Sequence, residues 1–76
     1  MATGGVGGSM TLSINGRERV IPAGTTLATL LAELQLDPLM IVVEHNRTIL
    51  RDRGRFATRT LGDGDTLELV HFVGGG

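Results

Sequence analysis

The chain ends in LVHFVGGG, and its three closing glycines are the residues best suited to chemistry. Glycine has no side chain, so a run of three fits a channel too narrow for other residues. Three extended residues reach about 10 Å, far enough to carry a terminal carboxylate into the buried site of a partner. That carboxylate is ionised at neutral pH, which makes it a poor electrophile but a fair nucleophile. We therefore expect Gly74 and Gly75 to form a flexible tail that presents the carboxylate of Gly76 as the candidate reactive group.

Two residue types that commonly perform covalent chemistry are missing from the sequence. Without cysteine, the chain offers no thiol for a persulfide, a disulfide or a thiolate-bound metal. Without lysine, it has no side-chain amine for a Schiff base or an isopeptide bond. Any persulfide that takes part in the chemistry of this chain must therefore be carried by another protein.

Four polar side chains raise the question of a metal site. His45 and His71 are the two histidines of the chain, and their spacing matches no ligand motif, so a structural or surface role is favoured. Asp63 and Asp65 resemble a fragment of a calcium loop, but the other ligands of such a loop are missing, which favours a plain turn at 62–65. We expect no bound metal and no bound cofactor.

Length and composition place the chain among small globular domains. Its 76 residues suffice for one modest core that buries about 60% of the unfolded surface, with no room for a deep active site. The net charge of -1 gives no pull toward nucleic acid or membrane, and no apolar run approaches the roughly 20 residues of a membrane span. Residues 1–9 are Gly-rich, lack the pattern of a signal peptide and are interpreted as a disordered leader or an expression remnant. Cytoplasm is the expected location.

The first half of the domain predicts a hairpin followed by a helix. Alternating apolar residues at 10–14 indicate a half-buried strand, Asn15-Gly16 is a favoured two-residue turn, and 17–21 returns as the second strand. The segment 25–34 predicts a helix that either threonine at its start can cap. Its leucines form one apolar stripe that must pack on a sheet: Leu27, Leu30, Leu31 and Leu34.

The second half predicts further strands. The β-branched run at 39–45 indicates one strand, and 48–50 indicates a short one. Residues 51–61 show no clean period and are expected to be irregular. After a turn at 62–65, the segment 66–73 alternates as the final strand. The irregular segment is expected to be held by two apolar side chains: Phe56 and Leu61.

This order of elements predicts the fold class. A hairpin, a crossing helix and returning strands make an α+β domain, with a mixed sheet of four to five strands and one main helix packed across one face. The helix is too short to be stable alone in water, so it must lie on the sheet. We expect the domain to span 10–73, with 74–76 as its tail.

The final strand has two different faces. Leu67 and Leu69 alternate with Val70 and Phe72, so we expect the leucines under the helix and the other two side chains on the open face. An exposed apolar patch beside the tail suggests a protein interface. We therefore predict partner contacts for Val70, Phe72 and the neighbouring Val73.

Arginines are concentrated between positions 47 and 59. A solvated surface is the favoured interpretation. The alternative is a docking patch for an acidic surface of a partner. The cluster consists of Arg47, Arg51, Arg53, Arg55 and Arg59.

Several segments resemble the ThiS-type sulfur carriers of thiamine biosynthesis, a family with the β-grasp, or ubiquitin-like, fold. The resemblance covers essentially the whole chain from Met10. Its most specific part is the motif DGD followed by a strand that ends in HFVGGG. The matching segments are INGRE at 14–18, GTTLATLL at 24–31, VEHN at 43–46 and GDGDTLELVHFVGGG at 62–76.

The resemblance implies a carrier that is acted on by enzymes and is not itself an enzyme. An E1-like adenylyltransferase of the ThiF type would consume ATP and adenylate Gly76. Sulfur from a persulfide donor would then replace AMP and leave a thiocarboxylate, which a ThiG-type thiazole synthase would use to build the thiazole ring of thiamine. Two alternatives stay open: a carrier for molybdopterin or cysteine synthesis, and a ubiquitin-like binding module that is never thiolated.

Overall fold

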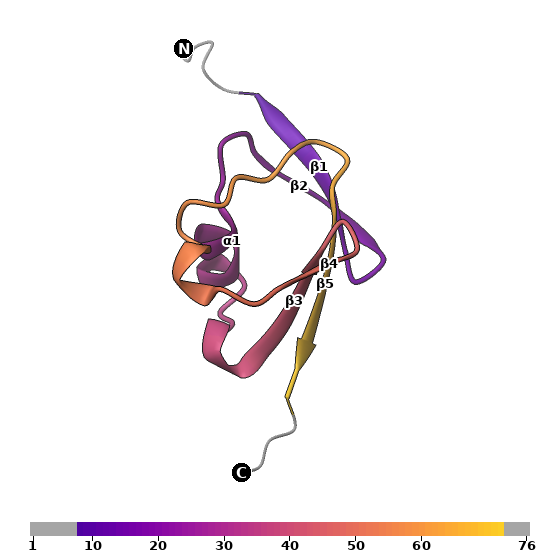
Figure 1. Ribbon diagram of the computed structural model, residues 1–76. Coiled ribbons are helices and arrows are strands. Elements are labelled where there is room, and N and C mark those ends of the chain that lie inside the picture. The colour runs from indigo at the N-terminus through magenta and orange to yellow at the C-terminus, as the bar shows by residue number, and fades with distance from the viewer. Residues whose placement is uncertain (1–7, 73–76) are drawn as a thin grey trace.

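The computed structural model describes residues 8–72, which form a five-stranded mixed sheet with one main helix across one face (Figure 1). The strand order is β2-β1-β5-β3-β4, in which β1 and β5 are parallel and the other neighbours are antiparallel. The predicted α+β architecture is confirmed. The strands are β1 (Ser9–Ile14), β2 (Arg17–Pro22), β3 (Ile41–His45), β4 (Thr48–Leu50) and β5 (Thr66–His71).

The hairpin of β1 and β2 forms where the sequence predicts it. Asn15 and Gly16 have φ values of 51° and 81°, so both central residues take the left-handed conformation that matches the twist of the strands. The strand begins earlier than expected, because Ser9 pairs with Pro22 and therefore belongs to the sheet and not to the leader. The remainder of the expected leader, residues 1–7, lies outside the described residues.

The first three residues of the helix α1 (Leu27–Glu33) donate their backbone N–H groups to partners outside the pattern of the helix. The first four amide groups at the start of a helix, counted from the cap residue, have no partner within it. Here Leu27 donates to the carbonyl of Arg59 at 2.9 Å and Ala28 to that of Phe56 at 3.0 Å. Thr29 donates to the hydroxyl of the cap residue Thr26 at 3.3 Å. The irregular segment after β4 is therefore hydrogen-bonded to the start of the helix.

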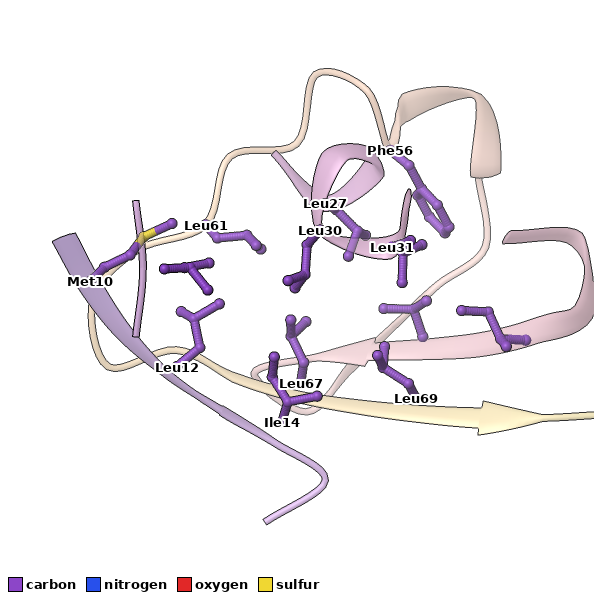
Figure 2. Packing of buried hydrophobic residues seen from close by; sticks show 13 residues of the cluster. Met10, Leu12, Ile14, Leu27, Leu30, Leu31, Phe56, Leu61, Leu67 and Leu69 are labelled. Atoms are coloured by element: carbon purple, nitrogen blue, oxygen red, sulfur yellow. The ribbon is translucent and has the colours of Figure 1, made fainter. Parts of the chain in front are cut away.

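The core lies between α1 and one face of the sheet. Figure 2 shows the side chains of Leu27, Leu30 and Leu31 pointing from the helix toward the strands, with Leu67 among those opposite. Phe56 reaches this core from the irregular segment and lies beside the helix near Leu31 (Figure 2), and both expected apolar contacts of that segment, Phe56 and Leu61, are buried. The buried hydrophobic cluster consists of Met10, Leu12, Ile14, Ile21, Leu27, Leu30, Leu31, Ile41, Val43, Phe56, Leu61, Leu67 and Leu69.

In the second half of the chain, two further strand boundaries differ from the prediction. The strand expected at 39–45 begins only at Ile41, because Pro38–Met40 forms a 3₁₀ helix. The side chain of Asp37 caps this turn by accepting a hydrogen bond from Leu39 at 2.9 Å, and proline suits its first position. At the other end of the chain, β5 ends at His71, so Phe72 follows the strand. Within residues 8–72, no helix is long and apolar enough to span a bilayer.

Candidate functional site

The predicted chemical group lies outside the part of the chain that the structure describes. Gly74, Gly75, Gly76 and the neighbouring Val73 all follow residue 72. The structure does describe the segment that leads to them, which is the end of β5 (Figure 1). We therefore take the C-terminal half of β5 and the surface around it as the candidate site.

The N-terminal half of β5 is held on both of its edges. On one edge it pairs with β3, and on the other Ser13 and Ile14 of β1 lie beside Thr66 and Leu67. Beyond the end of β1, the side chain of Asn15 continues the pairing. Its Oδ1 accepts from the backbone N–H of Leu69 at 2.7 Å, and its Nδ2 donates to the carbonyl of Leu69 at 3.1 Å. One amide side chain thus replaces a missing peptide unit of the sheet.

The C-terminal half of β5 is paired in the structure along the β3 edge. There Val70 lies opposite Val42, and His71 lies opposite Ile41. The backbone N–H of Phe72 donates to the carbonyl of Met40 at 3.0 Å, which extends the contact past the strand. This bond fixes the position at which the chain leaves the sheet toward residue 73.

Arg53 connects three segments at this exit point. Its Nε donates to the carbonyl of Pro38 at 2.8 Å, and one terminal nitrogen donates to the carbonyl of Ile41 at 3.0 Å. The guanidinium carbon lies 6.0 Å from the centre of the Phe72 ring, within the range of a cation–π interaction. The arginine therefore links the start of β3 to the residue that follows β5.

The open face beside this exit is apolar and hollowed. Val70 is 58% exposed, Phe72 is 45% exposed and Ile49 is 49% exposed. The predicted division of β5 is confirmed, because Leu67 and Leu69 are buried on the other face. Next to Phe72 lies a hollow of about 380 Å³, lined by Val42, Ile49, Leu50, Arg51, Arg53 and Phe72. Exposed apolar side chains around a hollow are typical of a protein interface.

His45, the one buried polar residue in the described chain, belongs to a hydrogen-bond network and not to a metal site. Arg59 can only donate, so its Nε bond of 3.0 Å makes His45 Nδ1 an acceptor. His45 Nε2 then carries the proton and donates to Asp65 Oδ2 at 2.7 Å. Within residues 8–72, no three His, Cys, Asp or Glu side chains are grouped as metal ligands.

Asp65 and Asp63 organise the predicted turn at 62–65. Asp65 accepts from the Gly62 amide at 2.7 Å and from Asn46 at 3.1 Å, while Asp63 accepts from the amide of Thr11 at 2.7 Å. Burial alone would raise the pKa of Asp65, but the hydrogen bonds from His45, the Gly62 amide and Asn46 outweigh it and hold that pKa below its ordinary value. The turn interpretation is therefore confirmed, and both carboxylates serve the fold.

The arginine cluster divides into several roles, which the sequence pattern does not reveal. Arg53 and Arg59 form the internal hydrogen bonds described above. Arg55 pairs with Asp52 at 3.4 Å on the exposed surface, where such a pair contributes little to stability. Arg51 lines the hollow of the open face. The favoured interpretation, a uniformly solvated surface, is wrong for Arg53 and Arg59.

The comparisons with known proteins agree with one another. The sequence model of the ThiS family matches residues 10–76. The chain is 39% identical over 66 residues to the sulfur carrier protein ThiS of Bacillus subtilis, and the match covers 86% of this chain and 98% of that protein. It also matches the crystal structure of the thiamine biosynthesis protein ThiS from Geobacter metallireducens, with a TM-score of 0.74 and 30% identity over 88% of this chain and all of that one.

Two longer proteins match as well. The chain is 43% identical over 67 residues to a thiazole synthase of Paramagnetospirillum magneticum and 39% identical over 67 residues to one of Magnetococcus marinus. Each match covers 88% of this chain but 20% of the thiazole synthase. The chain therefore spans about a fifth of the length of these two relatives.

Proposed function

Because the chain belongs to the ThiS family, we propose that it is a sulfur carrier of thiamine biosynthesis whose C-terminal glycine, Gly76, becomes a thiocarboxylate. The observation that carries the proposal is the family match, which runs to residue 76 and so includes the glycines. The Bacillus subtilis relative is named a sulfur carrier protein, which supports the carrier role. The Geobacter metallireducens relative is named a thiamine biosynthesis protein, which supports the pathway.

The proposed chemistry begins at the carboxylate of Gly76. The carboxylate attacks the α-phosphate of ATP, the bond to the β-phosphate breaks, and pyrophosphate leaves. A persulfide sulfur on another protein then attacks the acyl carbon and expels AMP. A thiol cleaves the resulting acyl disulfide and leaves the thiocarboxylate. The carrier is the co-substrate in each step, because its own terminal carboxylate is transformed, and the persulfide comes from another protein since the chain contains no cysteine.

The partners follow from this chemistry. An E1-like adenylyltransferase of the ThiF type binds ATP, so the carrier itself needs no cofactor, and a ThiG-type thiazole synthase receives the sulfur. The two matching thiazole synthases support this second partner. Val70 and Phe72 on the open face, together with Val73, dock the carrier on these enzymes. All of these reactions belong in the cytoplasm.

Removal of Gly76 tests the role of the tail. The carboxylate would then end about 3.5 Å short of the activating phosphate. A displacement of 1 Å can already cost about a hundred-fold in rate. With the ThiF-type enzyme, we expect ATP–pyrophosphate exchange to fall to background and the melting temperature to stay unchanged. A variant without residues 1–7 is the control and should exchange normally.

Intact-mass measurement tests the modification itself. Incubation with ATP, the ThiF-type enzyme and a persulfide donor should replace one terminal oxygen by sulfur in the full-length chain. Sulfur on another residue, or none at all, would contradict the carrier role. A large fall in melting temperature on removal of Gly76 would instead show that the tail stabilises the fold.

A further inference from the structure

Two like charges lie side by side on the open face of the sheet. In the register of β3 and β5, Glu44 lies opposite Glu68, and the next pair on the same face is Val42 opposite Val70. Opposite residues of an antiparallel pair share a face, with Cβ atoms about 4.5–5.5 Å apart. Glu44 is half-buried and Glu68 is exposed. The carboxylates therefore border the apolar patch directly.

Within the described residues, no ion pair neutralises either of these two carboxylates. Like charges directly opposite each other destabilise a sheet. Across residues 8–72, the one salt bridge between charged side chains joins Arg55 to Asp52, and the hydrogen-bonded partner of Asp65 is His45, so neither contact includes Glu44 or Glu68. The neighbour of Glu44 on β4 is Ile49, which is apolar. By the general rule for like charges, this register disfavours the free carrier, and no described contact offsets it.

The opposite end of the same face is positively charged. Arg51 and Arg53 line the hollow beside Phe72, close to the start of β3. Glu44 and Glu68 lie farther along the same two strands, beyond the Val42–Val70 pair. The open face therefore has a carboxylate pair at one end, arginines at the other and an apolar surface between them.

We propose that Glu44 and Glu68 together bind one arginine side chain of the protein partner that docks on the open face, while an apolar side chain of that partner fills the hollow beside Phe72. A guanidinium presents five donors in a planar fork, so it can address two carboxylates at once. Its charge relieves the repulsion that the free carrier bears. This inference rests on the proposed function, because it concerns the adenylyltransferase that must recognise the carrier.

The order of charges also sets the orientation of docking. Complementary charges across an interface fix its register and speed the encounter. A partner with arginine at one end of its contact surface and a carboxylate at the other fits this face in one direction. That direction determines where the chain after Phe72 enters the partner. The acid pair is thus a specificity determinant for the delivery of the tail.

Three charge-neutral variants test the proposal: Glu44→Gln, Glu68→Gln and the double variant. Binding to the purified ThiF-type adenylyltransferase is measured by calorimetry at low and high salt, and the stability of the free carrier by urea unfolding. We expect each single substitution to raise Kd by about ten-fold or more and the double variant to lose most of the salt dependence. The stability of the free carrier should stay the same or rise. The control is Glu33→Gln on α1, which should bind like the wild type.

The outcomes separate this inference from the carrier function. If the double variant bound the enzyme with the Kd and the salt dependence of the wild type, the acid-pair proposal would be overturned and the carrier function would stand. A wild-type chain that the enzyme neither binds nor adenylates would overturn both. A fall in the stability of the double variant would assign the carboxylates to the fold. If the chain formed a dimer and the substitutions dissociated it, the open face would bind a second copy of the chain, and the proposal would also be overturned.

Discussion

The two faces of the sheet are built from the same strands and have opposite properties. On the covered face, Leu67 is fully buried beneath α1. On the open face, Val70 and Phe72 of the same C-terminal segment are about half exposed. Because side chains of a strand alternate with a period of two, neighbouring residues serve folding and recognition in turn. Substitutions should therefore affect one property while leaving the other nearly intact.

The largest expected difference is between Leu67→Ala and Val70→Ala. Removal of a fully buried leucine side chain costs about 2–5 kcal/mol of unfolding free energy. The exposed valine on the other face should cost less than about 0.5 kcal/mol. Urea unfolding followed by far-ultraviolet circular dichroism measures both, since the chain has no tryptophan. Equal losses would contradict the division of the strand into two faces.

Asn15→Gly tests how much the hydrogen bonds between the Asn15 side chain and the edge of β5 contribute to stability. Glycine accepts the positive φ of 51° but removes both hydrogen bonds to Leu69. Leu69 is buried, so its unpaired amide and carbonyl should cost about 1–3 kcal/mol. Hydrogen exchange of the Leu69 amide should accelerate. A substitution without effect would show that water replaces the side chain at no cost.

Asp65→Asn tests the polar network at the rim of the covered face. The folded pKa of Asp65 lies below its unfolded value, so its contribution is complete above about pH 4 and is lost as the pH falls through the folded pKa. We expect the variant to lose about 1–2 kcal/mol at neutral pH. Its stability should also depend less steeply on pH below about pH 4. Urea midpoints measured from pH 2 to pH 7 check this window, and parallel curves for both proteins would contradict it.

Phe72→Asp should have a small effect on unfolding and a clear effect on binding. The ring is 45% exposed, and the variant keeps the backbone bond to Met40. Burial of a phenylalanine in an interface contributes about 1.5–3 kcal/mol, so affinity for the adenylyltransferase should fall by roughly ten-fold or more. Circular dichroism and calorimetry give the two values. A variant that unfolds would place Phe72 in the core.

Local patterns in the sequence predict the architecture well. The Asn15-Gly16 turn, the leucine stripe of α1 and the alternation of β5 each depend on residues close together in the chain, and all three are confirmed. Their hydrophobic periods also identify the buried leucines. The start of β3 is the exception, because a capped proline turn takes over the first apolar residues of the run.

The polar contacts of the site cannot be predicted from local sequence patterns. Asn15 and Leu69 are 54 positions apart, and His45 and Asp65 are 20 apart. Arg53 reaches the carbonyls of Pro38 and Ile41, and no periodicity distinguishes it from its neighbouring arginines. These contacts depend on which strands become neighbours. The roles of Gly74–Gly76 remain predictions, because these residues follow the described part of the chain.

The order β2-β1-β5-β3-β4 leaves β2 and β4 at the two edges of the sheet, and this affects how the protein behaves at high concentration. Exposed edges can pair with other chains and start aggregation. β4 offers only three residues, Thr48–Leu50, and β2 begins with the charged run Arg17, Glu18 and Arg19. Short and charged edges both discourage such pairing. The sheet can thus expose an apolar face for specific docking while its edges resist the growth of fibrils.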